Sequence, residues 1–211
     1  MTSLDSAREA LRERQGSGAR YDAAEAPSRD LRWARLGTAM FLRRLNELTD
    51  AQLVEPARSG LWSRAHVIAD IAYHARALCR QIEAVAVGLP TPPMYEGPIE
   101  TLDAVILGGT LPPRALRHLF EHAAIHLDVV WRDLPGRLWA AETPDEQGHP
   151  RPLSRTAFER VAVLCLGAIE LNNGSRWSDL PRDLREALDN GYLRKNVTAS
   201  AFISNQTRTT Q

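Results

Sequence analysis

Residues 63–88 read SRAHVIADIAYHARALCRQIEAVAVG, and this stretch decides the fold. Its apolar residues recur every three or four positions, the spacing that places side chains on one face of an α-helix. Ser63 suits the start because its hydroxyl can accept a hydrogen bond from a free backbone amide, and Gly88 suits the stop. The stretch therefore predicts a long helix with one buried face.

Three further segments show the same helical spacing, and they are predicted over 28–50, 112–134 and 154–169. Short helices are predicted over 100–107 and 181–188. The proline-rich residues between the second and third long helices predict a long connection, and the sequence contains no internal repeat and no convincing strand. The predicted fold class is all-α: a four-helix bundle with a long crossover connection and short extra helices.

The bundle is expected to occupy residues 29–195. Residues 1–28 are polar and are interrupted at Gly16, Ser17 and Gly18, which predicts a flexible N-terminal arm. Residues 196–211 are dominated by Thr, Ser and Asn, which predicts a flexible C-terminal tail.

Charge and composition exclude several classes of protein. The 26 basic and 26 acidic residues balance, so no net positive field attracts nucleic acid or an anionic membrane. No apolar run approaches the length of a membrane span, and the N-terminus lacks the apolar segment of a secretory signal. Cys79 and Cys165 lie within apolar helical patterns, as reduced thiols of cytosolic proteins do. We therefore expect a cytoplasmic protein that acts on a small molecule.

Three blocks of sequence resemble one known family. Residues 59–72 read SGLWSRAHVIADIA, 126–135 read HLDVVWRDLP and 171–181 read LNNGSRWSDLP. The first block is similar to the pattern Gly-Trp-Ser/Thr-Arg-x-His-Val-x-x-His-Leu-Ala, which opens the second helix of mycothiol-dependent maleylpyruvate isomerases and other DinB-like proteins. The other two blocks follow in the order found in that family, so the resemblance spans about residues 30–190.

The resemblance implies a four-helix bundle that holds a divalent metal, often zinc, and works with a low-molecular-weight thiol such as mycothiol. In the isomerases of this family, the thiolate adds to a cis double bond, and rotation about the former double bond becomes possible. The thiolate is then eliminated, and the product is the trans isomer. Neither cysteine of this chain stands at the matching site, so the thiol would be external.

The resemblance also implies positions for the metal ligands. The first ligand, four residues after the signature tryptophan, corresponds to His66. The other two are a carboxylate and a histidine on the fourth helix, and they fall at Val163 and Gly167, which cannot bind a metal. The inherited metal site is therefore expected to be altered.

A substitute site is one alternative. His118, His122 and His126 recur at four-residue spacing, and His122 and His126 with His66 would give the three protein ligands of a catalytic zinc. The other interpretation is a partly solvated helix face. His74 is expected to be a polar interior contact.

Three functions remain open. The leading hypothesis is a maleylpyruvate isomerase-like enzyme, a thiol-dependent isomerase or thiol transferase for a small unsaturated carboxylated metabolite. Its candidate catalytic residues are His66, His126 and Arg64, whose guanidinium could hold a carboxylate or instead pair with a surface acid. A metal-free enzyme with His66 as acid or base is the second hypothesis, and a non-catalytic binding or regulatory bundle is the third.

Overall fold

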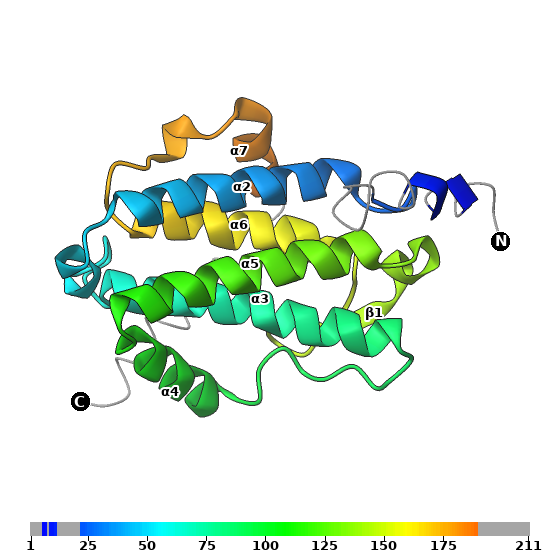
Figure 1. Cartoon of the computed structure of the whole chain (residues 1–211), viewed down its shortest axis with the longest axis horizontal. Helices are drawn as coiled ribbons and strands as arrows, with labels where there is room; N and C mark the ends of the chain where they lie inside the picture. Colours follow the sequence, from blue (N-terminus) through cyan, green and yellow to red (C-terminus); the bar gives the residue numbers. More distant parts are fainter. Residues whose placement is uncertain (1–5, 8, 12–21, 190–211) are drawn as a thin grey trace.

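Four long helices pack side by side in the described part of the chain, residues 6–7, 9–11 and 22–189 of this computed structural model (Figure 1). They are α2 (Ser28–Glu47), α3 (Arg64–Ala86), α5 (Pro113–Asp133) and α6 (Arg155–Glu170). Each coincides with a segment predicted from its apolar spacing. The all-α bundle expected from the sequence is therefore confirmed.

Helices α2 and α6 run in one direction and α3 and α5 in the other, as the colours of Figure 1 show. The helix ends are tied together accordingly. Arg64 at the start of α3 donates Nε to the carbonyl of Leu171 just beyond α6 at 2.6 Å, and Arg117 near the start of α5 donates Nη1 to the carbonyl of Leu45 on α2 at 2.6 Å. Because α3 and α5 are parallel, the chain must return between them, which confirms the long crossover.

The crossover contains α4 (Pro98–Gly109), which packs on the first half of α3. A Cβ atom on Gly108 would lie 2.7 Å from the Cβ of Ala69 and 2.9 Å from the ring of Tyr73. Only glycine permits so close an approach of two helices. Helix α4 therefore covers part of the face of α3 on which His66 lies.

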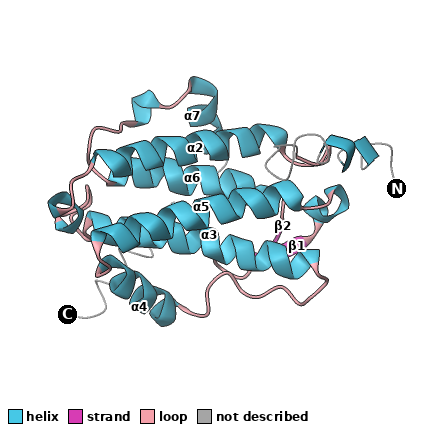
Figure 2. Cartoon of the chain, viewed as in Figure 1, coloured by secondary structure: helices cyan, strands magenta, loops and turns pink. Residues whose placement is uncertain are grey.

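A small antiparallel hairpin lies between α5 and α6 (Figure 2), and it corrects the expectation that the chain lacks strands. Strand β1 (Glu142–Pro144) pairs with β2 (Pro150–Pro152), with Thr143 opposite Arg151. Asp145 fixes the turn by accepting two backbone amide hydrogen bonds at 2.9 and 2.8 Å. These strands were not predicted because they are three residues long, contain prolines and lack an alternating apolar pattern.

The remaining described elements are short: η1 (Ala51–Val54), η2 (Gly136–Ala140), η3 (Trp177–Asp179) and α7 (Arg182–Leu188). Helix α7 confirms the short helix expected over 181–188. Most of the expected N-terminal arm and all of the expected tail over 196–211 lie outside the described residues. At the end of the arm, Ala23 and Ala26 are buried in the core cluster.

Aromatic and aliphatic side chains fill the space between the helices. The rings of Phe41 on α2 and Phe120 on α5 tilt against each other with centroids 4.6 Å apart. Trp131 on α5 donates its indole N–H to the hydroxyl of Thr156 on α6 at 3.2 Å. In the described part of the chain, no helix is both long enough and apolar enough to cross a membrane.

Candidate functional site

His66 lies in the first turn of α3 and is half-buried. Its Nδ1 atom is 2.6 Å from the hydroxyl of Ser63, and its ring packs against Trp62 with centroids 5.0 Å apart. Ser63 is the N-cap residue as predicted, but its hydroxyl contacts the imidazole instead of a backbone amide. A Cβ atom on Gly109 of α4 would come within 2.5 Å of Nε2 of His66, so α4 covers the ring closely. Burial lowers the pKa of His66, which favours the neutral imidazole.

Arg64 is buried and fully engaged in holding chain segments together. Its guanidinium donates to the carbonyls of Leu171 and Gln52 and pairs with the carboxylate of Glu55 at 2.5 Å. The pairing with a nearby acid is the alternative that the sequence left open. This guanidinium joins the connector before α3 to the end of α6. Its hydrogen bonds are already made to protein groups.

The three histidines of α5 do not come together with His66. The Nε2 atom of His126 lies 2.8 Å from Oε1 of Glu83, near the far end of α3. Glu83 is almost five helical turns beyond His66, a separation of about 25 Å along the helix. His122 is exposed and stacks only loosely on His126, with centroids 6.3 Å apart. The substitute metal site built from His66, His122 and His126 therefore does not form in this geometry.

The family ligand positions on α6 do not fit a metal either. Val163 and Gly167 carry no ligating atom, and a Cβ atom on Gly167 would lie 2.1 Å from Cδ1 of Ile71, so an apolar side chain fills that space. Among the described residues, no group of three His, Cys, Asp or Glu side chains could hold a metal ion. The described residues at these positions therefore do not fit a metal ion.

A different polar cluster occupies the bundle interior between α3 and α6. Arg160 on α6 and His74 on α3 are 1% and 3% exposed. Arg160 donates Nη1 to the carbonyl of Ile71 at 2.6 Å and to Nδ1 of His74 at 3.3 Å. Its Nη2 atom is buried and has no hydrogen-bond partner in the described structure. The expectation that His74 is a polar interior contact is confirmed.

Two carboxyl groups face this cluster. Asp70 lies one turn after His66 and one turn before His74, so the three residues share a face of α3. Burial raises the pKa of Asp70 to about 6, although Arg160 opposes the shift. Glu146 in the hairpin turn has its pKa raised to about 7 by burial and by repulsion from Asp70, and its Oε1 is 3.9 Å from Nε2 of His74.

The same cluster is anchored to the hairpin through Arg151. Its Nε is 2.8 Å from Oε2 of Glu159, its Nη1 donates to the hydroxyl of Thr143 at 2.6 Å, and its Nη2 donates to the side chain of Gln81 at 3.3 Å. Burial raises the pKa of Glu159 to about 7 even though Arg151 lowers it. The hairpin is thus held against α3 and α6 by a buried polar network.

Both cysteines are inert in this structure. Cys79 and Cys165 are 2% and 0% exposed. Burial raises the pKa of each thiol to about 12, so neither supplies a thiolate near neutral pH. A thiol-dependent reaction in this chain would need an external thiol, as the sequence led us to expect.

Sequence reasoning missed most of the cluster: Asp70, Glu146, Arg151, Glu159 and Arg160. Two signals could have found part of it. Asp70 stands where the family pattern has its second histidine, and Arg160 interrupts an otherwise apolar helix. The hairpin residues carried no such signal because their approach to α3 depends on tertiary structure.

A helical bundle that holds carboxyl groups with raised pKa values and a buried guanidinium between two of its helices is typical of a small-molecule enzyme or binding protein. The family model for the mycothiol maleylpyruvate isomerase N-terminal domain matches residues 34–162. The chain belongs to this family.

Solved structures agree with this assignment. Crystal structures of a mycothiol-dependent maleylpyruvate isomerase, and of a histidine-to-alanine variant of it, each match with 34% sequence identity and a TM-score of 0.72. The match covers 77% of this chain and 67% of the isomerase chain. A search of curated proteins gave no match. The isomerase family predicted from the sequence is confirmed.

Proposed function

We propose that the chain is a thiol-dependent isomerase or thiol transferase for a small unsaturated carboxylated molecule, and that it works without a metal. The observation that carries this proposal is the cluster of Asp70, His74 and Arg160 between α3 and α6, in which a carboxyl with a pKa of about 6 lies near an incompletely bonded guanidinium. Groups with shifted pKa values gather at functional sites more often than elsewhere.

Arg160 supplies the anion-binding group of the proposal. A buried cation with an unused donor is costly, and a carboxylate that accepts from Nη2 would relieve that cost. His74 stays neutral, because burial and the charges of Arg160 and Arg151 hold its pKa well below the usual range. It therefore accepts from Arg160 at Nδ1 and carries its own proton on Nε2.

Asp70 supplies the acid and base. With a pKa of about 6 it is mostly ionised at neutral pH and can still bind a proton, which is the balance that general acid–base catalysis requires. We assign to it the proton of the incoming thiol: a carboxylate oxygen of Asp70 accepts that proton and returns it when the thiol leaves. Glu146, with a pKa of about 7, is placed to exchange protons with solvent from the hairpin turn.

The family name implies mycothiol, and the residues fit an external thiol. A bound thiol would supply the nucleophile that adds to the double bond and leaves it, a role that neither buried cysteine can fill. The positive charge of Arg160 favours a thiolate as well as a carboxylate. His66 lies one turn before Asp70 on the same face of α3 and is half-buried. It is a neutral group at the outer end of the row formed by His66, Asp70 and His74.

Access is expected from the side of the hairpin. Asp70 is partly exposed and the carboxylate side chain of Glu146 is 35% exposed, whereas Arg160 and His74 are closed off beneath them. A substrate would reach Arg160 when the turn at residues 145–149 moves outward. Loop motion of this kind also keeps water from the reacting groups once the loop has closed.

The test is thiol-dependent turnover by purified, chelator-treated protein. Maleylpyruvate is incubated with and without mycothiol, and the trans isomer is quantified by chromatography. We expect turnover that requires the thiol and persists after chelation. It should fall about 100-fold in Asp70→Asn. The control Asp103→Asn, at an exposed acid of α4, should leave turnover unchanged. No thiol-dependent conversion of maleylpyruvate or maleate, or loss of conversion on chelation, would contradict the proposal.

A non-catalytic binding protein is the second candidate. The observation that favours it is the pair Val163 and Gly167 at the family ligand positions, where the space beside Gly167 is filled by Ile71. Saturable binding of maleate, measured by calorimetry, without any turnover in the presence of thiol would support this candidate over the first.

A further inference from the structure

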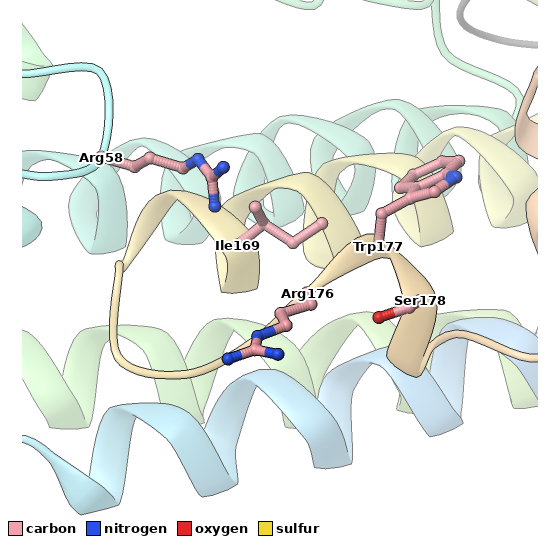
Figure 3. Close-up of a pocket in the computed structure, with 5 residues that line it drawn as sticks. All are labelled: Arg58, Ile169, Arg176, Trp177 and Ser178. Atoms are coloured by element: carbon pink, nitrogen blue, oxygen red, sulfur yellow. The ribbon is translucent and has the colours of Figure 1, made fainter.

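A pocket lies on the surface at the end of α6, apart from the polar cluster (Figure 3). It has a volume of about 580 Å³ and is lined by Arg58, Ile169, Arg176, Trp177 and Ser178. Ile169 is nine positions after Arg160 on α6, about 14 Å along the helix axis. The volume is within the range of small-molecule sites.

Two guanidinium groups are directed to this pocket from different segments. Arg58 comes from the connector before α3 and Arg176 from the loop after α6, and Figure 3 shows their side chains on either side of Ile169. Neither guanidinium forms an ion pair with another described residue. The acids close to them in the chain bind backbone amides: Glu170 accepts from the backbone amide of Ser59 at 2.7 Å, and Asp179 accepts from the backbone amide of Arg176 at 2.9 Å. The residues that line the pocket therefore include two cations and no acid.

The wall of the pocket is apolar and aromatic. Trp177 is half-buried and packs against the core, so its indole is held in place, and Ile169 supplies an aliphatic surface beside it. A fixed indole offers a face on which a planar conjugated group can stack. The hydroxyl of Ser178 adds a polar group at the edge.

The loop that carries Arg176 and Trp177 is held rigidly. Asn173 donates its side-chain amide to the carbonyl of Arg44 on α2 at 2.7 Å, and Arg44 donates Nε to the hydroxyl of Ser175 at 3.0 Å. Gly174 has a φ of +103°, a conformation that L side chains rarely adopt, which lets the chain turn back at this point. On the opposite side, the amide of Arg58 donates to the carbonyl of Glu170 at 2.9 Å. The backbone that carries these side chains is thus held in place before any ligand arrives, which lowers the cost of binding.

We propose that this pocket binds an organic anion with a planar conjugated or aromatic body. The two guanidinium groups hold its carboxylate, because their planar fork matches carboxylate geometry, and Trp177 stacks on its flat body. This inference goes beyond the proposed function, since it concerns a separate site that shares no residue with the cluster around Asp70. A phosphate alone would satisfy the charges but would leave the indole unused.

Calorimetry on the full chain tests the proposal with cinnamate as the probe. We expect saturable binding of cinnamate and at least tenfold weaker binding of its neutral amide, because an ion-pair hydrogen bond to a carboxylate is lost. The double variant Arg58→Gln with Arg176→Gln should weaken cinnamate binding by at least tenfold. The control variant Arg114→Gln, at an exposed position of α5, should leave it unchanged.

Localisation comes from the indole N–H resonance of Trp177, assigned with Trp177→Phe, which should shift on addition of cinnamate. The proposal is overturned if cinnamate does not bind saturably, if the double variant binds it normally, or if the neutral amide or inorganic phosphate binds as tightly. Thiol-dependent turnover of maleylpyruvate by the same double variant, measured in parallel, separates failure of this site from failure of the proposed function.

Discussion

Arg160 on α6 donates Nη1 to Nδ1 of His74 on α3 across 3.3 Å, and both side chains are almost fully excluded from solvent. The contact links two helices through a charged group and a neutral imidazole. Burial holds the pKa of His74 well below its usual range and raises the pKa of Asp70 to about 6; the charge of Arg160 adds to the first shift and opposes the second.

Replacement of Arg160 by methionine is expected to raise the pKa of Asp70 above about 6, since the opposing charge is lost while burial remains. The carboxyl resonance of Asp70, followed by NMR through a pH titration, measures this shift. Arg137→Met, at an exposed position of η2, is the control and should leave the resonance unaffected. An unmoved Asp70 titration in a folded Arg160→Met protein would show that the two groups do not interact.

The variant Asp70→Asn should change how stability depends on pH. The folded pKa of Asp70 is raised, so its contribution to stability is fully present below the unfolded pKa of about 4 and is lost as the pH rises through about 6. Relative to the parent, the variant should gain up to about 3 kcal/mol in unfolding free energy between pH 4 and pH 8. Urea unfolding at both pH values measures the difference, and a constant difference would argue that Asp70 titrates normally.

The close cover of His66 by α4 predicts a coupled pair of substitutions. Gly109→Ala places a methyl group against the imidazole and should cost about 1–3 kcal/mol, the usual penalty for overpacking. His66→Ala removes the ring, so the double variant should be more stable than the sum of the two single effects. Thermal unfolding of all four proteins gives the coupling energy; simple additivity would mean that the ring and α4 do not touch.

The buried cysteines should not react in the native protein. Cys79 and Cys165 have pKa values of about 12, so a disulfide reagent at pH 8 should label neither thiol until denaturant is added, after which both react. Counting labelled thiols by mass spectrometry checks this. Rapid labelling of either cysteine in the folded chain would reopen the question of an internal nucleophile.

The sequence predicted the architecture well because each long helix carries its own apolar period. Residues 63–88 alone indicated α3, and the proline-rich stretch after it indicated the long crossover that leads to α5. The hairpin was missed since its strands are held by Arg151 and its partners rather than by local propensity.

The site was predicted only in part. His66 and Asp70 share a face of α3 that the signature defines, but the sequence could not show that Arg160 reaches His74 or that Glu146 folds over it. Such contacts join residues far apart in the chain. The histidines of α5 were attractive because of their regular spacing, yet His126 is bonded to Glu83 at the other end of α3 from His66.

The pH profile of kcat/KM for thiol-dependent conversion of maleylpyruvate tests the central claim most directly, because it reports the base of the free enzyme. We predict a rise with pH governed by a pKa of about 6, and loss of that limb together with most of the activity in Asp70→Asn. An unchanged profile in Asp70→Asn would contradict the assignment of this carboxyl as the base and with it the metal-free site between α3 and α6.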